Sequence, residues 1–339
     1  MGSDEMPAEA LSFVLPAGSE RASGGNVYNR ELVRALRALE VPSLRTLAPA
    51  EFRRAIEQGE PGLYFVDTLN LPEAEVLAEK VPGQQSVLVV HHLPSLEPGV
   101  SPDDPAIGLE RATLPLFERF LVTSAFTADL LVRRGFARER ILTVEPGLPA
   151  VELGPVSLEP PFRALVVGNL IPRKGIRDLL FALAAAVAPG DAFSLDIMGR
   201  VDLDPAYAET VGRVITRSPA LAERVRWHHT ASYTEMGDHY RGASVLISAA
   251  SMETFGMALA EARAHGVPIL ALDGGYVSQQ FTDGVNGRLF SSIPALVDEF
   301  LRLVREPEKM QALTASARRT ATPGPDTWER AARSLLGQL

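Results

Sequence analysis

The chain has 339 residues, a formal net charge of −9 at pH 7 and no cysteine. Its length suits two domains better than a single core, and its acidic balance makes nucleic acid a poor general partner. Without cysteine it forms neither a disulfide bond nor a thiolate metal site.

The first seven residues, Met-Gly-Ser-Asp-Glu-Met-Pro, are polar and acidic, which is unlike a signal peptide. No apolar run approaches the roughly 20 residues that a membrane-spanning helix needs. We therefore expect a cytoplasmic protein. Peripheral attachment to an anionic membrane is the alternative, through arginines 30, 34 and 37 on one helical face, but such a stripe is more often the wet side of a helix.

The first half of the sequence alternates short apolar runs with segments of helical periodicity. We expect strands at 10–15, 63–67, 86–90, 120–123 and 141–144, and helices at 27–39, 71–80, 109–118 and 124–135. A polar glycine loop precedes the first helix. Such alternation is typical of right-handed βαβ units on a parallel sheet.

Residues 145–161 are rich in proline and glycine and lack periodicity, as an interdomain linker does. The alternation then resumes, with strands expected at 162–168, 193–198, 225–228, 243–248 and 267–272, and helices at 176–188, 206–217, 233–241, 292–304, 308–320 and 328–336. The sequence thus predicts a Rossmann-like domain at 1–150, a second at 151–325 and a final helix within 326–339.

Ligands of open α/β sheets bind beyond the carboxyl ends of the strands. The loop from Gly168 to Gly175 follows a predicted strand and contains Arg173 and Lys174. Arginine offers a planar fork and lysine a point charge, so the two side chains could grip a diphosphate. An exposed basic turn explains the dipeptide alone equally well.

Glu253 and Glu261 are eight residues apart, on either side of a glycine-containing turn. If a helix begins near Thr254, its first N–H groups point out beside Glu253, and Glu261 lies about 12 Å further at about 1.5 Å per residue. A helix N-terminus attracts phosphate, and carboxylates accept hydrogen bonds from hydroxyls. The pair therefore suits a nucleotide sugar, although two solvated helix glutamates are the simpler interpretation of the spacing alone.

Gly24 and Gly25 precede the first predicted helix, where glycine permits close approach of a phosphate or an acceptor. A Gly-Gly pair is usually only a turn. His91 and His92 follow a buried strand, where a histidine more often packs or caps. A metal pair is disfavoured because adjacent strand residues face opposite sides.

Residues 251–262, together with 264–271, Gly274-Gly275 and 283–289, resemble the E-x7-E signature of glycosyltransferase family 4, the retaining GT-B transferases. The similarity extends over nearly the whole chain. It implies an α/β GT-B fold, in which two Rossmann-like domains face a central cleft and the C-terminal helix packs back on the N-terminal domain.

The resemblance also implies roles for individual residues. Glu253, His91, Arg173 and Lys174 are the candidate catalytic residues, and donor binding is implied for Gly168, Arg173, Lys174, Phe255, Gly256 and Met257 at the diphosphate and Glu261 at the ribose. Gly24 and Gly25 are implied as further binding residues, beside phosphate or acceptor. Recognition of the base is expected from backbone atoms near residues 227–230.

Three positions depart from the family pattern. Asn169 stands where many members have arginine, Ser278 where the glutamate of Gly-Gly-x-x-Glu is common, and His92 where aspartate is common. With Asn169 in place of arginine, a contact to the phosphate is missing or is made by another residue. Ser278 in place of glutamate bears on which donor sugar is selected.

The implied activity is retaining, metal-independent transfer of a sugar from a nucleotide-diphosphate sugar to an acceptor. We expect a small soluble acceptor, or a natural-product or glycoconjugate intermediate, and no cofactor besides the donor substrate. Two alternatives remain open: a catalytically impaired nucleotide-sugar-binding partner protein, and a GT-B enzyme of other chemistry, such as a nucleotide-sugar epimerase or a phosphorylase.

Overall fold

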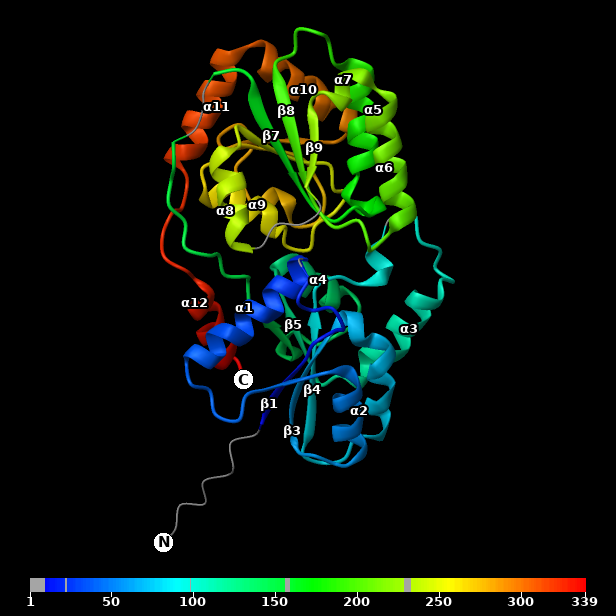
Figure 1. Ribbon diagram of the computed structural model, residues 1–339. Helices are drawn as coiled ribbons and strands as arrows, with labels where there is room; N and C mark the ends of the chain where they lie inside the picture. Colours follow the sequence, from blue (N-terminus) through cyan, green and yellow to red (C-terminus); the bar gives the residue numbers. More distant parts are fainter. Residues whose placement is uncertain (1–9, 22, 98, 156–158, 229–232) are drawn as a thin grey trace. The chain divides into compact units, whose positions relative to one another are not determined.

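The computed structural model describes residues 10–21, 23–97, 99–155, 159–228 and 233–339. The chain divides into two compact units (Figure 1). Unit 1 comprises Met1–Arg21, Gly25–Gly147 and Thr327–Leu339, and unit 2 comprises Ala22–Gly24 and Leu148–Asp326. Within the described ranges, no helix is long and apolar enough to cross a membrane.

Unit 1 contains a six-stranded parallel sheet in the order β2-β1-β3-β4-β5-β6. The strands are β1 (Leu11–Val14), β2 (Arg45–Leu47), β3 (Gly62–Asp67), β4 (Gln84–Val90), β5 (Arg119–Val122) and β6 (Ile141–Thr143). This is the flavodoxin-like order, in which the direction of strand addition reverses between β1 and β3. The reversal opens space for a ligand beyond the carboxyl ends of those two strands.

The helices of unit 1 cover both faces of its sheet. They are α1 (Gly24–Ala38), α2 (Pro49–Glu57), α3 (Pro105–Thr113), α4 (Ala125–Arg133) and α12 (Trp328–Leu336), with 3-10 segments η1 (Thr68–Glu79), η2 (Pro94–Leu96), η3 (Leu114–Leu116) and η4 (Arg138–Arg140). The segment predicted as a helix at 71–80 is therefore a 3-10 segment. It contains Pro72, which removes a backbone donor, and is kinked at Asn70.

The alternation of side chains along β3 distributes its residues between two apolar layers. Tyr64 and Val66 join the cluster under α2 and η1, whereas Phe65 points to the opposite face and stacks on Phe13 with 4.5 Å between ring centroids. On strands of period two, neighbouring residues face opposite sides. This pattern is why the sheet is buried on both faces.

Helix α12 belongs to unit 1 although it is last in sequence. Its fully buried Trp328 lies edge-on to Tyr28, with 5.8 Å between the ring centroids, and the Tyr28 hydroxyl donates to the Val144 carbonyl at 3.1 Å. Beyond the helix, the Gln338 amide accepts from the Thr143 N–H at 3.1 Å and donates to the Thr143 carbonyl at 3.2 Å. The C-terminal segment thereby pairs the exposed edge of β6.

Unit 2 contains a second six-stranded parallel sheet in the order β12-β11-β10-β7-β8-β9. The strands are β7 (Phe162–Val167), β8 (Phe193–Met198), β9 (Val225–His228), β10 (Val245–Ser248), β11 (Ile269–Leu272) and β12 (Gly287–Phe290). Counted from β7, this is the 3-2-1-4-5-6 order of Rossmann folds, with its reversal between β7 and β10.

Helices cover both faces of this sheet as well (Figure 1). They are α5 (Ile176–Ala186), α6 (Pro205–Arg217), α7 (Pro219–Ala222), α8 (Tyr233–Gly242), α9 (Met257–Ala264), α10 (Ile293–Arg305) and α11 (Pro307–Arg319), with 3-10 segments η5 (Pro172–Lys174) and η6 (Val277–Gln279). Val245 and Ile247 of β10 face the cluster of α5 and α10, and Leu246 faces that of α8 and α9.

The two sheets confirm the predicted α/β class, and most predicted elements lie within a few residues of the observed ones. Among the strands and α-helices of the described residues, β2, α2, the four-residue α7 and β12 were not predicted. The β2 strand is three residues long and none of them is buried, so it lacks an apolar run. The α2 helix did carry a signal, because Phe52, Ala55 and Ile56 have helical spacing and are buried.

Candidate functional site

Three loops of unit 2 converge beyond the carboxyl ends of β7, β10 and β11. The N–H of Ser251 donates to the Arg173 carbonyl at 3.0 Å, and the N–H of Glu253 donates to the Gly274 carbonyl at 3.3 Å. The N–H of Tyr276 in turn donates to the Glu253 carbonyl at 2.8 Å. These bonds bring the predicted residues of the three loops together at the β7–β10 reversal, where Rossmann folds bind ligands.

At the centre of these loops, two cationic side chains surround one carboxylate. Lys174 Nζ lies 2.5 Å from Glu253 Oε1. Arg173 Nη1 donates to the Met252 carbonyl at 3.1 Å and lies 3.8 Å from Glu253 Oε2. All three charged side chains are less than one-fifth exposed, so solvent screens them weakly. One positive charge remains in excess, which favours an anionic ligand.

Gly175 fixes the course of the loop that carries the two cations. Its φ is +63°, and a Cβ on this residue would lie 2.2 Å from the Ala249 carbonyl oxygen. Glycine alone tolerates both the left-handed backbone and the close approach. At Gly168, a Cβ would lie 3.2 Å from Cδ of Lys174, so the lysine stem runs over that glycine.

Helix α9 begins at Met257, with Gly256 as its N-cap at φ +85°. The expectation of a helix opening near Thr254 is therefore wrong: the left-handed Gly256 ends the preceding turn and Glu253 pairs with Gly275 in a parallel bridge. The axial estimate of about 12 Å between the two glutamates does not apply. The first-turn N–H groups of α9, near Met257, still leave a helix N-terminus directly after the loop of Glu253.

Glu261, the fifth residue of α9, is buried inside unit 2. The hydroxyl of Tyr240 on α8 donates to its Oε2 at 2.7 Å. Burial raises the pKa of the Glu261 carboxyl to about 7, although the Tyr240 hydrogen bond acts to lower it. The ring of Tyr240 also stacks on His265, with 5.2 Å between centroids. Tyr240 was missed by sequence reasoning, because no motif connects it to Glu261.

Two of the three departures from the family pattern, Asn169 and Ser278, lie in unit 2. Asn169 Oδ1 accepts from the backbone N–H of Arg200 at 3.4 Å, which ties the loop after β7 to the end of β8. The Arg200 side chain is buried and paired with Asp202, through bonds of 2.8 and 2.7 Å. Ser278 lies in η6. Of residues 227–230, where base recognition was expected, His229 and Thr230 lie outside the described residues.

In unit 1, His91 lies beyond the carboxyl end of β4 and meets two polar side chains. Its Nε2 is 3.0 Å from Asn29 Oδ1 and 3.2 Å from Asp67 Oδ2. Asn29 Nδ2 donates to the same Asp67 oxygen at 2.5 Å. A Cβ on Gly25 would lie 2.9 Å from Cδ2 of His91, so the predicted Gly25 and His91 are in contact. His92 instead lies 2.9 Å from Glu97.

Asp67, the last residue of β3, is almost fully buried, with 1% of its side chain exposed. Burial alone would raise its pKa, but the charge and hydrogen bond of His91, the Leu69 N–H and the Asn29 amide together hold the pKa of the carboxyl below its ordinary value. Asp67 therefore stays ionised at neutral pH. Neither Asp67 nor Asn29 was predicted as a site residue.

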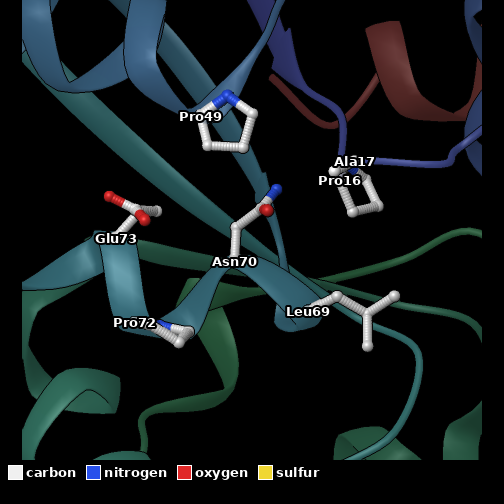
Figure 2. Close-up of a pocket in the computed structure, with 7 residues that line it drawn as sticks. All are labelled: Pro16, Ala17, Pro49, Leu69, Asn70, Pro72 and Glu73. Atoms are coloured by element: carbon white, nitrogen blue, oxygen red, sulfur yellow. The ribbon is translucent and has the colours of Figure 1, made fainter.

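Unit 1 also has a hollow of about 320 Å³ beyond the carboxyl ends of β1 and β3, at the reversal of strand order. Its lining residues are Pro16, Ala17, Pro49, Leu69, Asn70, Pro72 and Glu73. Figure 2 shows Asn70 at the centre of this group. The hollow adjoins the His91 network, because Asp67 Oδ1 accepts the Leu69 N–H at 2.7 Å.

The sequence also raised the possibility of a basic stripe formed by arginines 30, 34 and 37 on α1. Glu31 lies between Arg30 and Arg34, with Nε–Oε distances of 3.4 and 2.6 Å, so an acidic residue interrupts the arginine stripe. Across the ranges that the structure describes, we find no group of three histidine or acidic side chains placed to hold a metal ion.

Residues 155–320 match the model of the family described as glycosyl transferases group 1. Among curated proteins, the chain is 29% identical over 243 residues to a D-inositol 3-phosphate glycosyltransferase of Catenulispora acidiphila, covering 65% of this chain and 57% of that protein. A D-inositol 3-phosphate glycosyltransferase of Rhodococcus opacus is 27% identical over 267 residues, which cover 71% of this chain and 57% of the relative. The chain thus spans a little over half the length of these relatives.

Two solved structures resemble the whole chain. A sucrose-phosphate synthase from Thermosynechococcus elongatus has a TM-score of 0.77 at 19% identity, over 97% of this chain and 98% of that one. HepE from Anabaena, crystallised with UDP and glucose, has a TM-score of 0.73 at 15% identity, over 98% and 100%. At such identities the likeness establishes the fold: two Rossmann-like α/β units of the GT-B class.

Proposed function

We propose that this protein is a retaining glycosyltransferase that moves a sugar from a nucleotide-diphosphate sugar to an acceptor hydroxyl. The observation that carries the proposal is the meeting of Arg173, Lys174 and Glu253 at the β7–β10 reversal, immediately before the N-terminus of α9. Cations and a helix N-terminus suit a diphosphate, and a carboxylate suits sugar hydroxyls. The family match over residues 155–320 covers all of these residues and supports the proposal.

The leaving diphosphate would be neutralised by Arg173, Lys174 and the first N–H groups of α9, without a metal ion or other cofactor. Preorganised positive groups of this kind stabilise charge that develops as the bond to the sugar breaks. Glu253 would accept hydrogen bonds from the sugar hydroxyls and Glu261 from the ribose. No residue of this constellation is an evident covalent nucleophile, which favours front-face displacement with retention, the leaving phosphate helping to deprotonate the acceptor.

The acceptor would be presented by unit 1, through Gly25, His91 and the hollow at the β1–β3 reversal. The hollow has mainly apolar walls of proline, leucine and alanine, with Asn70 and Glu73 as polar groups. That lining suits a small uncharged acceptor or a natural-product intermediate with a hydroxyl. The inositol phosphate transferases among the relatives support a polyol acceptor as the first to test, and the HepE complex supports UDP-glucose as the first donor.

The proposal is tested by measuring release of nucleoside diphosphate with and without acceptor. We expect release that depends on the acceptor, yields a glycoside with the donor's anomeric configuration and persists in chelator. Lys174→Ala should abolish it, whereas Lys309→Ala, which changes a half-exposed lysine of α11, should not. An epimerase would instead convert the donor without acceptor, and donor binding without turnover against any acceptor would indicate a binding protein.

A further inference from the structure

The turn before α9 is anchored to the end of η6 by one buried side chain. Gln280 is 2% exposed, and its Nε2 donates to the Phe255 carbonyl at 2.7 Å. A carbonyl oxygen only accepts hydrogen bonds, so the amide nitrogen must be the atom that faces it. The backbone carbonyl of Gln280 in turn accepts from Nη1 of Arg263, in the last turn of α9, at 2.8 Å. Gln280 therefore connects η6 both to the last turn of α9 and to the turn that precedes the helix.

Holding the Phe255 carbonyl also sets the direction of the next N–H. A trans peptide is planar, so its C=O and N–H point in opposite directions. With the carbonyl directed at Gln280, the Gly256 N–H points away from η6, and no acceptor among the described residues takes it. A Cβ on Gly256 would lie 3.5 Å from Cβ of Glu253, whose carboxylate Lys174 contacts. The N–H thus belongs to the turn that carries the charged cluster.

We infer that Gln280 is a positioning residue, which holds the Phe255–Gly256 peptide so that its N–H donates to the diphosphate of the donor. This inference rests on the proposed function, in which Arg173 and Lys174 bind the same diphosphate. Gly256 has a φ of +85° and no side chain, so without the Gln280 hydrogen bond the peptide could rotate at low steric cost. A preorganised donor stabilises an anion without reorganisation when the ligand binds.

A purely structural role for Gln280 is the competing explanation. Removing a donor from a buried carbonyl costs stability whether or not a ligand binds, so a loss of stability would not demonstrate positioning. Other contacts hold the turn in place: the rings of Phe255 and Tyr276 stack with 5.8 Å between centroids, and the Tyr276 N–H donates to the Glu253 carbonyl. Gln280→Met should therefore keep the turn while releasing the peptide, and the test must observe that peptide itself.

The sequence allows this peptide to be observed alone, because glycine follows phenylalanine only at Phe255-Gly256. Labelling phenylalanine with carbonyl carbon-13 and glycine with nitrogen-15 therefore gives one carbonyl–amide NMR correlation for the whole chain. In the wild type, we expect saturating pyrophosphate to move the Gly256 amide proton downfield, as a new hydrogen bond to an anion does. In Gln280→Met the carbonyl signal should already differ without ligand, and pyrophosphate should move the amide proton much less.

Calorimetric titration with pyrophosphate is the second measurement. Gln280→Met should weaken binding about 10-fold or more, the loss expected for one hydrogen bond to a charged group. Gln279→Met makes the same chemical change at the preceding residue, which is in η6 and exposed. This matched control should bind pyrophosphate as the wild type does.

A Gly256 amide proton that pyrophosphate leaves unmoved in the wild type would overturn the inference, and this result needs no folded variant. Equal pyrophosphate affinity in folded Gln280→Met and the wild type would overturn it as well. If the wild type binds neither pyrophosphate nor a nucleoside diphosphate, the proposed function fails together with the inference. If the wild type binds both and only the results for Gln280→Met disagree, the donor site stands and the role of Gln280 is structural.

Discussion

The hydroxyl of Tyr240 donates a 2.7 Å hydrogen bond to the carboxylate of Glu261, inside unit 2. This bond joins α8 to α9 and holds a titratable group at a buried position with 7% of its surface exposed. Because burial raises the pKa of Glu261 to about 7, the charge of this carboxyl changes near neutral pH. Donor binding and stability should both depend on that charge.

The first prediction concerns stability. Between the ordinary carboxyl pKa near 4.5 and the folded value of about 7, the folded state holds a proton that the unfolded state has released. Stability should therefore be greatest below pH 4.5 for this group and fall by about 3 kcal/mol as pH rises through 7. Glu261→Gln removes this dependence, because the amide does not titrate.

Urea unfolding at pH 5 and pH 8 measures the effect. The wild type should lose more stability between these two pH values than Glu261→Gln does. Glu209→Gln, at an exposed site on α6, is the control and should behave as the wild type. Equal pH dependence in the wild type and Glu261→Gln would contradict the assignment of a raised pKa.

Tyr240→Phe tests the hydrogen bond itself. The phenylalanine fills the same space but leaves the buried carboxyl without its donor, so the pKa of Glu261 should rise further above its ordinary value. Unfolding free energy should fall by about 1 kcal/mol. At pH 7 more of Glu261 would be protonated, and donor affinity should weaken, with recovery at pH 8.5. Calorimetric titration at the two pH values measures this, and a variant that is weaker by the same factor at both would contradict it.

How much of the site was predictable depended on local signals. Arg173 and Lys174 were predicted as site residues because they follow a strand run and precede a helical one. The structure places both next to Glu253, and their role in donor binding stays a prediction. Tyr240, Asp67 and Asn29 were missed because their partners are 21, 24 and 38 residues away in sequence. Only the pairing of strands and helices brings such residues together.

The ends of helices and strands were also predictable only where a local sequence pattern marks them. The expected 193–198, 225–228 and 328–336 coincide with β8, β9 and α12, because apolar periodicity marks both ends of each. The start of α9 was placed three residues too early, since nothing in the sequence shows that Gly256 adopts a left-handed conformation. The hollow at the β1–β3 reversal was unpredictable for a related reason: it depends on strand order, which the alternation of elements leaves open.

Glu253→Gln separates donor binding from transfer. Removing this charge frees Lys174 and Arg173 from their carboxylate partner, so the affinity for free nucleoside diphosphate should be equal to that of the wild type or higher. Turnover should fall, because the sugar loses a charged acceptor. Calorimetry and a steady-state assay measure the two effects. Weaker diphosphate binding together with unchanged turnover would contradict the role given to Glu253.

Gly175→Ala tests the loop that carries the two cations. The left-handed backbone and the 2.2 Å approach to the Ala249 carbonyl oxygen leave no room for a methyl group. We expect a loss of more than about 1 kcal/mol in unfolding free energy and weaker donor binding. Gly190→Ala is the matched control, because a Cβ there meets no atom within 4 Å. Equal stability of the two variants would refute the packing argument.

The central claim is that unit 2 binds a nucleotide-diphosphate sugar, with Glu261 at the ribose. Thermal unfolding of the wild type and Glu261→Ala with UDP-, GDP-, ADP- and dTDP-sugars tests it most directly. A ligand at 100 times its Kd stabilises the folded state by about 2.7 kcal/mol. The account predicts one clear responder in the wild type and a much smaller shift in Glu261→Ala. If no nucleotide sugar raises the melting temperature, or if Glu261→Ala responds as strongly as the wild type, the claim is contradicted.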